Sequence, residues 1–185
     1  MSLSRELKEI EEELQSNSTA TKIKAIHKVI GQMNMGKNVS SLYFSVMKCL
    51  EIKNEEIKKL VYLYVTQYSQ DFPKEAMMSV NSFIRDARDK RNSIVRAMAI
   101  RAMGCLRVPD LNDYLMDSLI EALSDDDSYV KKTVVLAILK INEVSQEAVK
   151  TSRVIEKLVL ILKENNNAYV IANTLVALNE MERQK

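Results

Sequence analysis

The chain has 185 residues, and with 27 basic and 25 acidic residues its formal charge is only +2, which argues against a dedicated nucleic-acid binder. It contains three glycines and two prolines, too few for the turns of an all-β sandwich or barrel. No apolar run approaches the ~20 residues that span a bilayer, and the charged N-terminus predicts no secretory signal. The two cysteines, Cys49 and Cys105, are therefore expected to be reduced thiols in the cytoplasm.

Amphipathic stretches follow one another along the chain and predict helices. Six are expected at residues 3–15, 20–33, 39–51, 74–87, 111–123 and 152–163. Four more begin after a polar capping residue, at Asn54, Asn92, Asp127 and Asn167. None of the breaks between these helices is long enough to be a linker, so residues 1–185 are expected to form a single domain.

The four capped helices recur at a nearly constant interval. The aligned positions Ile57, Val95, Val130 and Val170 lie 38, 35 and 40 residues apart, which is near the unit length of HEAT and armadillo repeats. One helix pair cannot bury its own apolar face, so neighbouring pairs stack on a shared core. The sequence therefore predicts an all-α fold, a right-handed α-solenoid of HEAT/armadillo-type helix pairs with about ten helices. Its predicted core includes Leu60, Leu63, Val95, Ile100, Val130, Ile138, Leu158 and Leu175.

Motifs that would support catalysis or cofactor binding are weak throughout the chain. Residues 31–38 nearly match a phosphate-binding loop, but Asn38 replaces the hydroxyl residue and the segment follows a helix instead of a strand. The single histidine, His27, cannot build a catalytic pair or a zinc site by itself. The acidic run 125–127 lacks the glycine of a calcium loop and is typical of a helix cap. We expect no catalytic, cofactor-binding or metal-binding residues, and hence no enzyme.

Several longer motifs resemble one known family. They are IKKLVYLY at residues 57–64, AMMSVNSF at 76–83, IVRAMAIRAMGCLRV at 94–108 and YVKKT at 129–133, with GKNVS at 36–40 upstream. In this order and spacing they resemble the N-terminal trunk of the β-adaptins, the large β subunits of clathrin adaptor complexes. The resemblance implies a cytoplasmic coat subunit that assembles with another large, a medium and a small subunit to select cargo on Golgi, endosomal or plasma membranes.

The resemblance also implies a contact with a GTPase. Family members that are recruited by a GTP-loaded Arf-family small GTPase contact it with residues matching Met77 and Val80, and Ile84 extends the same flank of helix 74–87. An exposed methionine beside a valine suits an adaptable apolar contact. Periodicity alone leaves a second interpretation open, in which this flank is another packed face of the solenoid.

A peripheral membrane surface is a further partner that the resemblance implies. Residues 17–50 carry five lysines and no acid, and each lysine near an anionic surface adds ~1 kcal/mol. Where family members often have a lysine-rich stretch between the first two helices, this chain has residues 16–21 without a lysine. Lys22, Lys24 and Lys28 are therefore the candidates for headgroup contact.

Two other functions share the predicted fold. A HEAT-like DNA glycosylase would need a basic concave surface with aromatic or acidic residues for a flipped base, and this chain has no tryptophan. A generic HEAT-repeat scaffold for nuclear transport or a phosphatase would have no need of the adaptin-type motifs. Family trunks continue for several hundred residues into a linker and an appendage. The chain is therefore expected to be a fragment or a truncated version, which would not bind clathrin through that linker.

Overall fold

The computed structural model describes residues 3–184, which form eleven α-helices, three short 3-10 helices and no strand. Residues 1, 2 and 185, which the predicted domain includes, lie outside the described residues. The prediction of an all-α fold is confirmed, and the number of helices is close to the expected ten. No helix in the described part of the chain is both long and apolar enough to cross a membrane.

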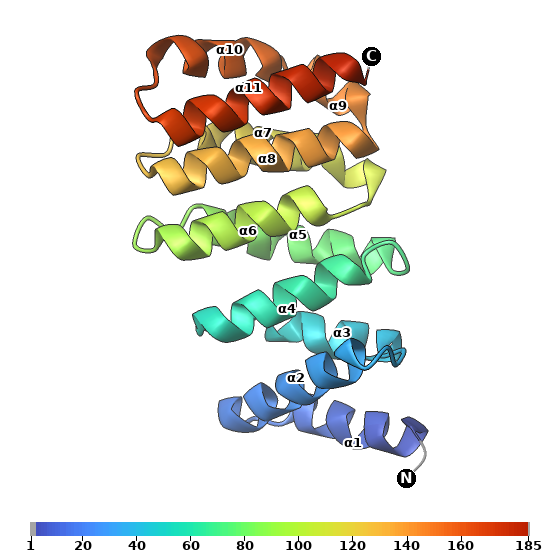
Figure 1. Cartoon of the computed structure of the whole chain (residues 1–185). Helices are drawn as coiled ribbons and strands as arrows, with labels where there is room; N and C mark the ends of the chain where they lie inside the picture. The colour runs from blue at the N-terminus through green and yellow to red at the C-terminus, as the bar shows by residue number, and fades with distance from the viewer. Residues whose placement is uncertain (1–2, 185) are drawn as a thin grey trace. The chain divides into compact units, whose positions relative to one another are not determined.

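The chain divides into two compact units, residues 1–79 and residues 80–185, with the division inside helix α5 (Pro73–Ala87). The first unit contains α1 (Leu3–Gln15), α2 (Thr19–Asn34), the short α3 (Tyr43–Met47) and α4 (Glu55–Gln67) (Figure 1). Here α2 packs against α1 and α4, and α3 packs against α4. The single helix predicted over 39–51 is in fact α3 flanked by two 3-10 helices, η1 (Ser40–Leu42) and η2 (Lys48–Glu51).

Buried aromatic side chains join α3 and α4 in the first unit. The ring of Tyr43 stacks on Phe72 with centroids 4.8 Å apart, and it lies 6.2 Å from the ring of Tyr64. The hydroxyl of Tyr64 donates to the carbonyl oxygen of Val39 at 2.5 Å, and that of Tyr43 to the carbonyl oxygen of Val65 at 3.3 Å. Burial raises the pKa of both phenols well above the ordinary value of tyrosine. These hydroxyls are therefore structural groups that satisfy backbone carbonyls.

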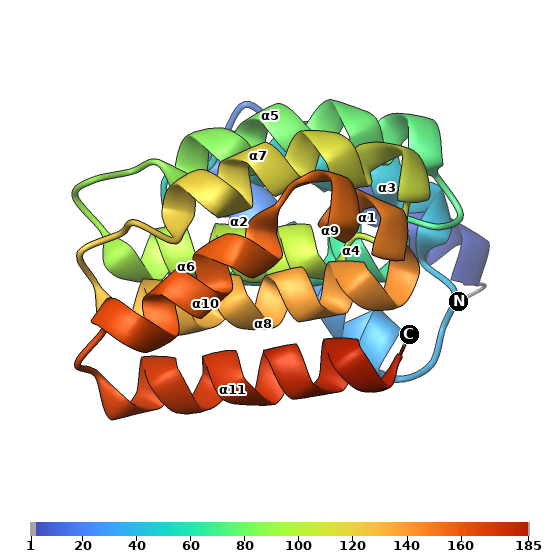
Figure 2. The ribbon, with the colours of Figure 1, turned by 90° about the horizontal axis from the view of Figure 1, so that it is seen from above.

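The second unit contains six complete helices. They are α6 (Ser93–Cys105), α7 (Asn112–Ala122), α8 (Ser128–Val144), α9 (Gln146–Thr151), α10 (Val154–Glu164) and α11 (Ala168–Arg183), with η3 (Pro109–Leu111) before α7. Helices α6, α8 and α11 lie side by side as one layer (Figure 1). Helices α7, α9 and α10 form a second layer that packs against the first (Figure 2). Helix α9 was not predicted, because its six residues are too few to show a period.

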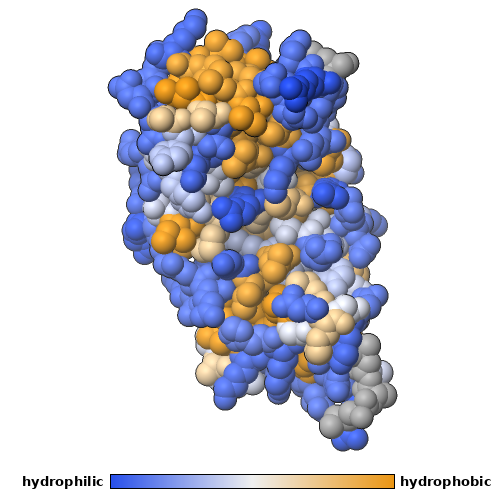
Figure 3. Space-filling model, viewed as in Figure 1, coloured by the Kyte–Doolittle hydropathy of each residue, from blue (hydrophilic) through white to orange (hydrophobic). Residues whose placement is uncertain are grey.

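Five of the eight predicted core residues are buried, one is half-buried and two are exposed. Val95, Ile100, Val130, Ile138 and Leu158 are buried as expected, and Leu60 is half-buried. The prediction is wrong for Leu63 and Leu175, which are 48% and 53% exposed. Leu63 lies about 160° around α4 from the buried Val61, and Leu175 lies about 160° around α11 from the buried Ala177. Leu175 is one of several exposed apolar side chains of α10 and α11, with Val159, Leu160 and Val176. Figure 3 shows an apolar area at this end of the second unit.

A glycine sets the distance between α6 and α8. A Cβ atom at Gly104 would lie 2.7 Å from the Cα and 2.8 Å from the Cβ of Ala137, closer than such atoms approach one another. The two helix backbones therefore meet at this point, and only the absence of a side chain allows it. The other glycine inside a helix, Gly31 of α2, has nothing within 4 Å of the same position.

Polar residues between α7 and α8 fix the start of α8. The carboxylate of Asp127 accepts a hydrogen bond from the backbone N–H of Tyr129 at 2.7 Å and caps the helix. A hydrogen bond from the Ser93 side chain, with the one from the Tyr129 N–H, lowers the pKa of the Asp127 carboxyl. Beside it Asp125 accepts two hydrogen bonds from the guanidinium of Arg96, at 2.7 and 3.0 Å. The prediction that residues 125–127 form a helix cap is confirmed.

Replacement of Gly104 by alanine should destabilise the chain. The added methyl group must push α8 away from α6, and such overpacking costs about 1–3 kcal/mol. Gly31→Ala is the matched control, since it adds a methyl group in open space and should stabilise by about 0.5–1 kcal/mol. Urea unfolding of both variants measures the difference. Equal effects of the two substitutions would mean that α6 and α8 do not meet at Gly104.

The cap at Asp127 should make stability depend on pH in the acid range. The pKa of Asp127 is lowered on folding, so the charged carboxylate stabilises the folded chain above about pH 4. This stabilisation is lost as the pH falls through the folded-state pKa. Asp127→Asn keeps a cap but removes the charge at the helix N-terminus, which should cost about 0.3–1 kcal/mol at pH 7. Chemical denaturation at pH 7 and pH 3 should show this difference shrinking at pH 3. If the difference in unfolding free energy between the wild-type chain and Asp127→Asn were the same at both pH values, the charge of Asp127 would not stabilise the helix.

Candidate interaction site

The three residues predicted to contact a GTPase lie on α5, but they are not equally accessible. Met77 is 49% exposed, Ile84 is half-buried and Val80 is only 6% exposed. Met77 and Ile84 are seven residues apart, about 20° from each other around the helix. These two side chains therefore share one face of α5.

The expectation that Val80 forms part of an exposed apolar flank needs correction. Val80 lies about 40° around α5 from Ala76, which is fully buried, and directly after Ser79, which is 1% exposed. It therefore belongs to the buried stripe of α5, together with Phe83. For Val80 the structure favours the second interpretation, that of a packed face.

An exposed methionine that the sequence prediction did not include lies next to Met77. Met78 is 62% exposed, and the two neighbouring thioethers put an adaptable apolar surface on the first half of α5. Helical spacing could have found it, because Met78 is about 160° from the buried Ala76.

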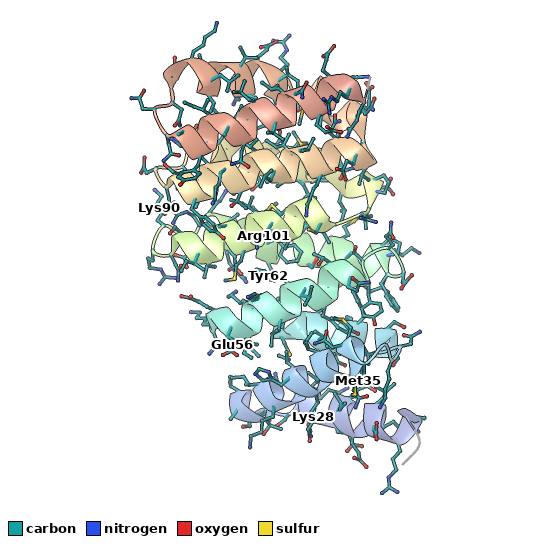
Figure 4. All side chains as sticks on the ribbon, in the orientation of Figure 1. Lys28, Met35, Glu56, Tyr62, Lys90 and Arg101 are labelled. Carbon is teal, nitrogen blue, oxygen red and sulfur yellow. The ribbon has the colours of Figure 1, made fainter. Side chains whose placement is uncertain are left out.

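The three candidate lysines of α2 are not gathered into one cluster. Lys28, labelled in Figure 4, is held by Glu13 of α1, with its Nζ 2.6 Å from one carboxylate oxygen. Lys24 is exposed on nearly the same face of α2 as Lys28. Lys22 faces away from both and lines a hollow of about 490 Å³ together with Lys48 and Lys53. The sequence did not single out these last two, since they follow α3 and approach Lys22 only in the folded chain.

The single histidine and the two cysteines lie apart from one another in the described residues. Within residues 3–184 no three histidine, cysteine or acidic side chains come together in a way that could hold a metal ion. His27 is exposed. Cys49 and Cys105 are both free, and burial raises the pKa of the Cys49 thiol.

Comparison with known proteins agrees with the class that this architecture defines, a helical-repeat protein with an adaptin-like order of motifs. The sequence model of the adaptin N-terminal region family matches residues 2–185 of this chain. The chain belongs to this family.

Its relatives are β subunits of adaptor complexes. The chain is 38% identical over 176 residues to the AP-1 complex subunit beta-1 of Homo sapiens, which covers 95% of this chain and 18% of the relative. It is 40% identical over 177 residues to the AP-1 complex subunit beta of Dictyostelium discoideum, covering 96% of this chain and 19% of the relative. The AP-3 complex subunit beta-2 of Mus musculus is 35% identical over 81% of this chain and 14% of its own length. The chain thus spans about a fifth of the length of the AP-1 relatives, and its predicted likeness to β-adaptins is confirmed.

Solved structures with a similar fold are helical-repeat proteins of low sequence identity. A designed armadillo repeat protein in complex with the peptide (KR)4 matches 97% of this chain and 86% of its own with a TM-score of 0.69 at 17% identity. Another designed armadillo repeat protein matches 94% of this chain and 81% of its own with a TM-score of 0.65 at 16% identity. This likeness confirms the armadillo-type fold.

Single substitutions of Val80 and Met77 should differ in their effect on stability, because one residue is on the packed side of α5 and the other on the exposed side. Val80→Asp places a charge among buried side chains and should destabilise the chain by about 3–5 kcal/mol. Met77→Asp changes an exposed side chain and should alter stability by about 0.5 kcal/mol or less. Thermal unfolding followed by circular dichroism measures both. Similar stability of the two variants would show that Val80 is accessible in solution.

Proposed function

We propose that the chain is the N-terminal part of a large β subunit of a clathrin-associated adaptor complex. In this role it is a non-enzymatic coat subunit in vesicle-mediated protein transport. The observation that carries the proposal is 38–40% identity to AP-1 β subunits over 95–96% of the chain. Identity to the AP-3 β subunit is 35% over a shorter part of the chain, which favours a complex of the AP-1 type.

The proposal includes partners that follow from that role. The subunit would assemble with another large, a medium and a small adaptor subunit in the cytoplasm and lie peripherally on Golgi, endosomal or plasma membranes. A stacked helical-repeat chain suits such a scaffold, because each repeat contacts only its neighbours and leaves extended surfaces for other proteins. Lys22, with Lys48 and Lys53 beside the same hollow, is the best-placed of the candidate headgroup contacts. Clathrin would bind elsewhere than on this part of the subunit.

Affinity purification of the tagged chain from its source cell tests the role. Recovery of medium and small adaptor chains would support it. Recovery of nuclear-transport factors or phosphatase subunits in their place would favour the alternative, a generic HEAT-repeat scaffold. Tight, salt-sensitive binding of the purified chain to DNA in a gel shift would favour a HEAT-like DNA-binding enzyme.

We further propose that the exposed face of α5 is the recruitment site for an Arf-family small GTPase. Met77 supports this because it is half-exposed, apolar and flexible, and such a side chain can adapt to the switch regions of a GTP-loaded partner. Ile84 extends the same face by two turns of the helix. Val80, being buried, would support the face from beneath and would not itself touch the GTPase.

Met77→Asp should weaken binding to the GTP-loaded GTPase by about 5- to 30-fold, because a desolvated apolar contact at the centre of an interface contributes about 1–2 kcal/mol. Isothermal titration calorimetry with the GTP-loaded and GDP-loaded GTPase measures the effect. Met35→Asp is the matched control, since Met35 is an exposed methionine at the end of α2.

Wild-type affinity in the Met77→Asp variant would place the GTPase contact elsewhere. An equal loss in the Met35→Asp variant would also contradict the proposal, because it would reflect added charge alone. If Met77→Asp lost its helical circular dichroism signal, Met77 would be a core residue and the packed-face interpretation would hold for it as well.

A further inference from the structure

The layer of α6, α8 and α11 carries a basic hollow that the proposed function does not use. It measures about 300 Å³ and lies wholly within the second unit. Arg101 of α6, labelled in Figure 4, lies on one side of it. Helix α8 forms its floor with Tyr129, Lys132, Leu136 and Lys140, and Asn173 of α11 lies on the other side.

Within the described part of the chain, no carboxylate pairs with the cations of this hollow. Arg101, Lys132 and Lys140 form no ion pair with any residue of the described range 3–184, and none of the described lining residues is acidic. Elsewhere in the same unit, by contrast, Arg88 pairs with Glu121 and Arg96 with Asp125. Three like charges around one concavity repel one another, and an anionic ligand would relieve that repulsion.

Tyr129 holds two of the cations in place. The guanidinium of Arg101 donates to the Tyr129 hydroxyl at 3.2 Å, and the Nζ of Lys132 lies 4.8 Å from the centre of the Tyr129 ring. The third cation, Lys140, has its Nζ 3.2 Å from the Sγ of Cys105. Side chains that are already ordered lose less entropy when they bind a ligand.

The spacing of the cations along α8 matches an extended peptide. Lys132 and Lys140 are eight residues apart, which is about 12 Å along a helix. Residues i and i+4 of an extended peptide are about 13 Å apart and project to the same side, as does residue i+2 between them. The exposed Leu136 lies midway between the two lysines and offers an apolar contact at that position.

We propose that this hollow binds an extended acidic segment of a partner protein. Carboxylates at positions i and i+4 of the segment pair with Lys132 and Lys140, and an apolar residue at i+2 lies on Leu136. Arg101 adds a planar donor for a further carboxylate. The side-chain N–H of Asn173 donates to the carbonyl oxygen of Tyr169 at 2.7 Å, which orients the amide oxygen of Asn173 to accept from the peptide backbone.

The test uses the full 185-residue chain and a fluorescein-labelled peptide, GSEDLDEGS, in which two glutamates flank a leucine at the required spacing. Fluorescence anisotropy at low salt should show binding that weakens as salt is added. The variant R101E/K132E/K140E should bind about tenfold more weakly or worse, since three exposed ion pairs are replaced by repulsion. The variant R107E/K150E/K157E makes the same change in net charge at exposed positions outside the hollow and should retain most of the affinity.

A second peptide, GSLEDDEGS, has the same composition and charge but lacks the spacing, and it should bind more weakly than the first. Equal binding of the two peptides, equal losses in the two triple variants, or no binding by the wild-type chain would each overturn the proposal. Co-sedimentation with phosphatidylserine vesicles tests whether the hollow binds an anionic membrane surface instead of a peptide. Vesicle binding that is lost only in R101E/K132E/K140E, without peptide binding, would assign the hollow to a membrane surface instead.

Discussion

The close contact of α6 with α8 at Gly104 determines how the second unit is built. Because the two backbones meet there without an intervening side chain, the buried stripes of both helices are brought together along their lengths. Val95 and Ile100 of α6 and Val130 and Ile138 of α8 are all buried. The outward faces of the same helices are held at a fixed distance, and the basic hollow lies between them. The absence of a side chain at Gly104 therefore affects both the packing of the core and the spacing of the surface residues around the hollow.

Much of the fold could be predicted from local signals. The caps at Asn54, Asn92, Asp127 and Asn167 each accept backbone N–H bonds at the start of a helix, so they mark the repeat correctly. Helix α9 could not be found in this way, since its cap at Ser145 directly follows α8 and its six residues show no period. Leu63 and Leu175 were wrongly predicted to be buried. A leucine in a helix can lie on either face, and its residue type alone does not say which face packs against the neighbouring helices.

The candidate surfaces were harder to predict, because they depend on contacts between distant residues. Sequence spacing put Met77, Val80 and Ile84 on one flank of α5, but it could not tell that the valine is enclosed while the methionine is half-exposed. Lys22 lies near Lys48 and Lys53 only once the first unit has folded. Similarly, Arg101 and Lys132 are 31 residues apart, and it is Tyr129 that brings them together. In each case the decisive information is tertiary.

The tyrosines provide the molecule with two distinct optical environments. The chain has seven tyrosines and no tryptophan. In the first unit Tyr43 and Tyr64 are enclosed, with hydroxyls bonded to backbone carbonyls. In the second unit Tyr114, Tyr129 and Tyr169 are all exposed to solvent. Burial raises the pKa of Tyr43 and Tyr64 well above the ordinary value of tyrosine, so the late part of an alkaline titration of tyrosinate absorbance reports on these two enclosed phenols of the first unit.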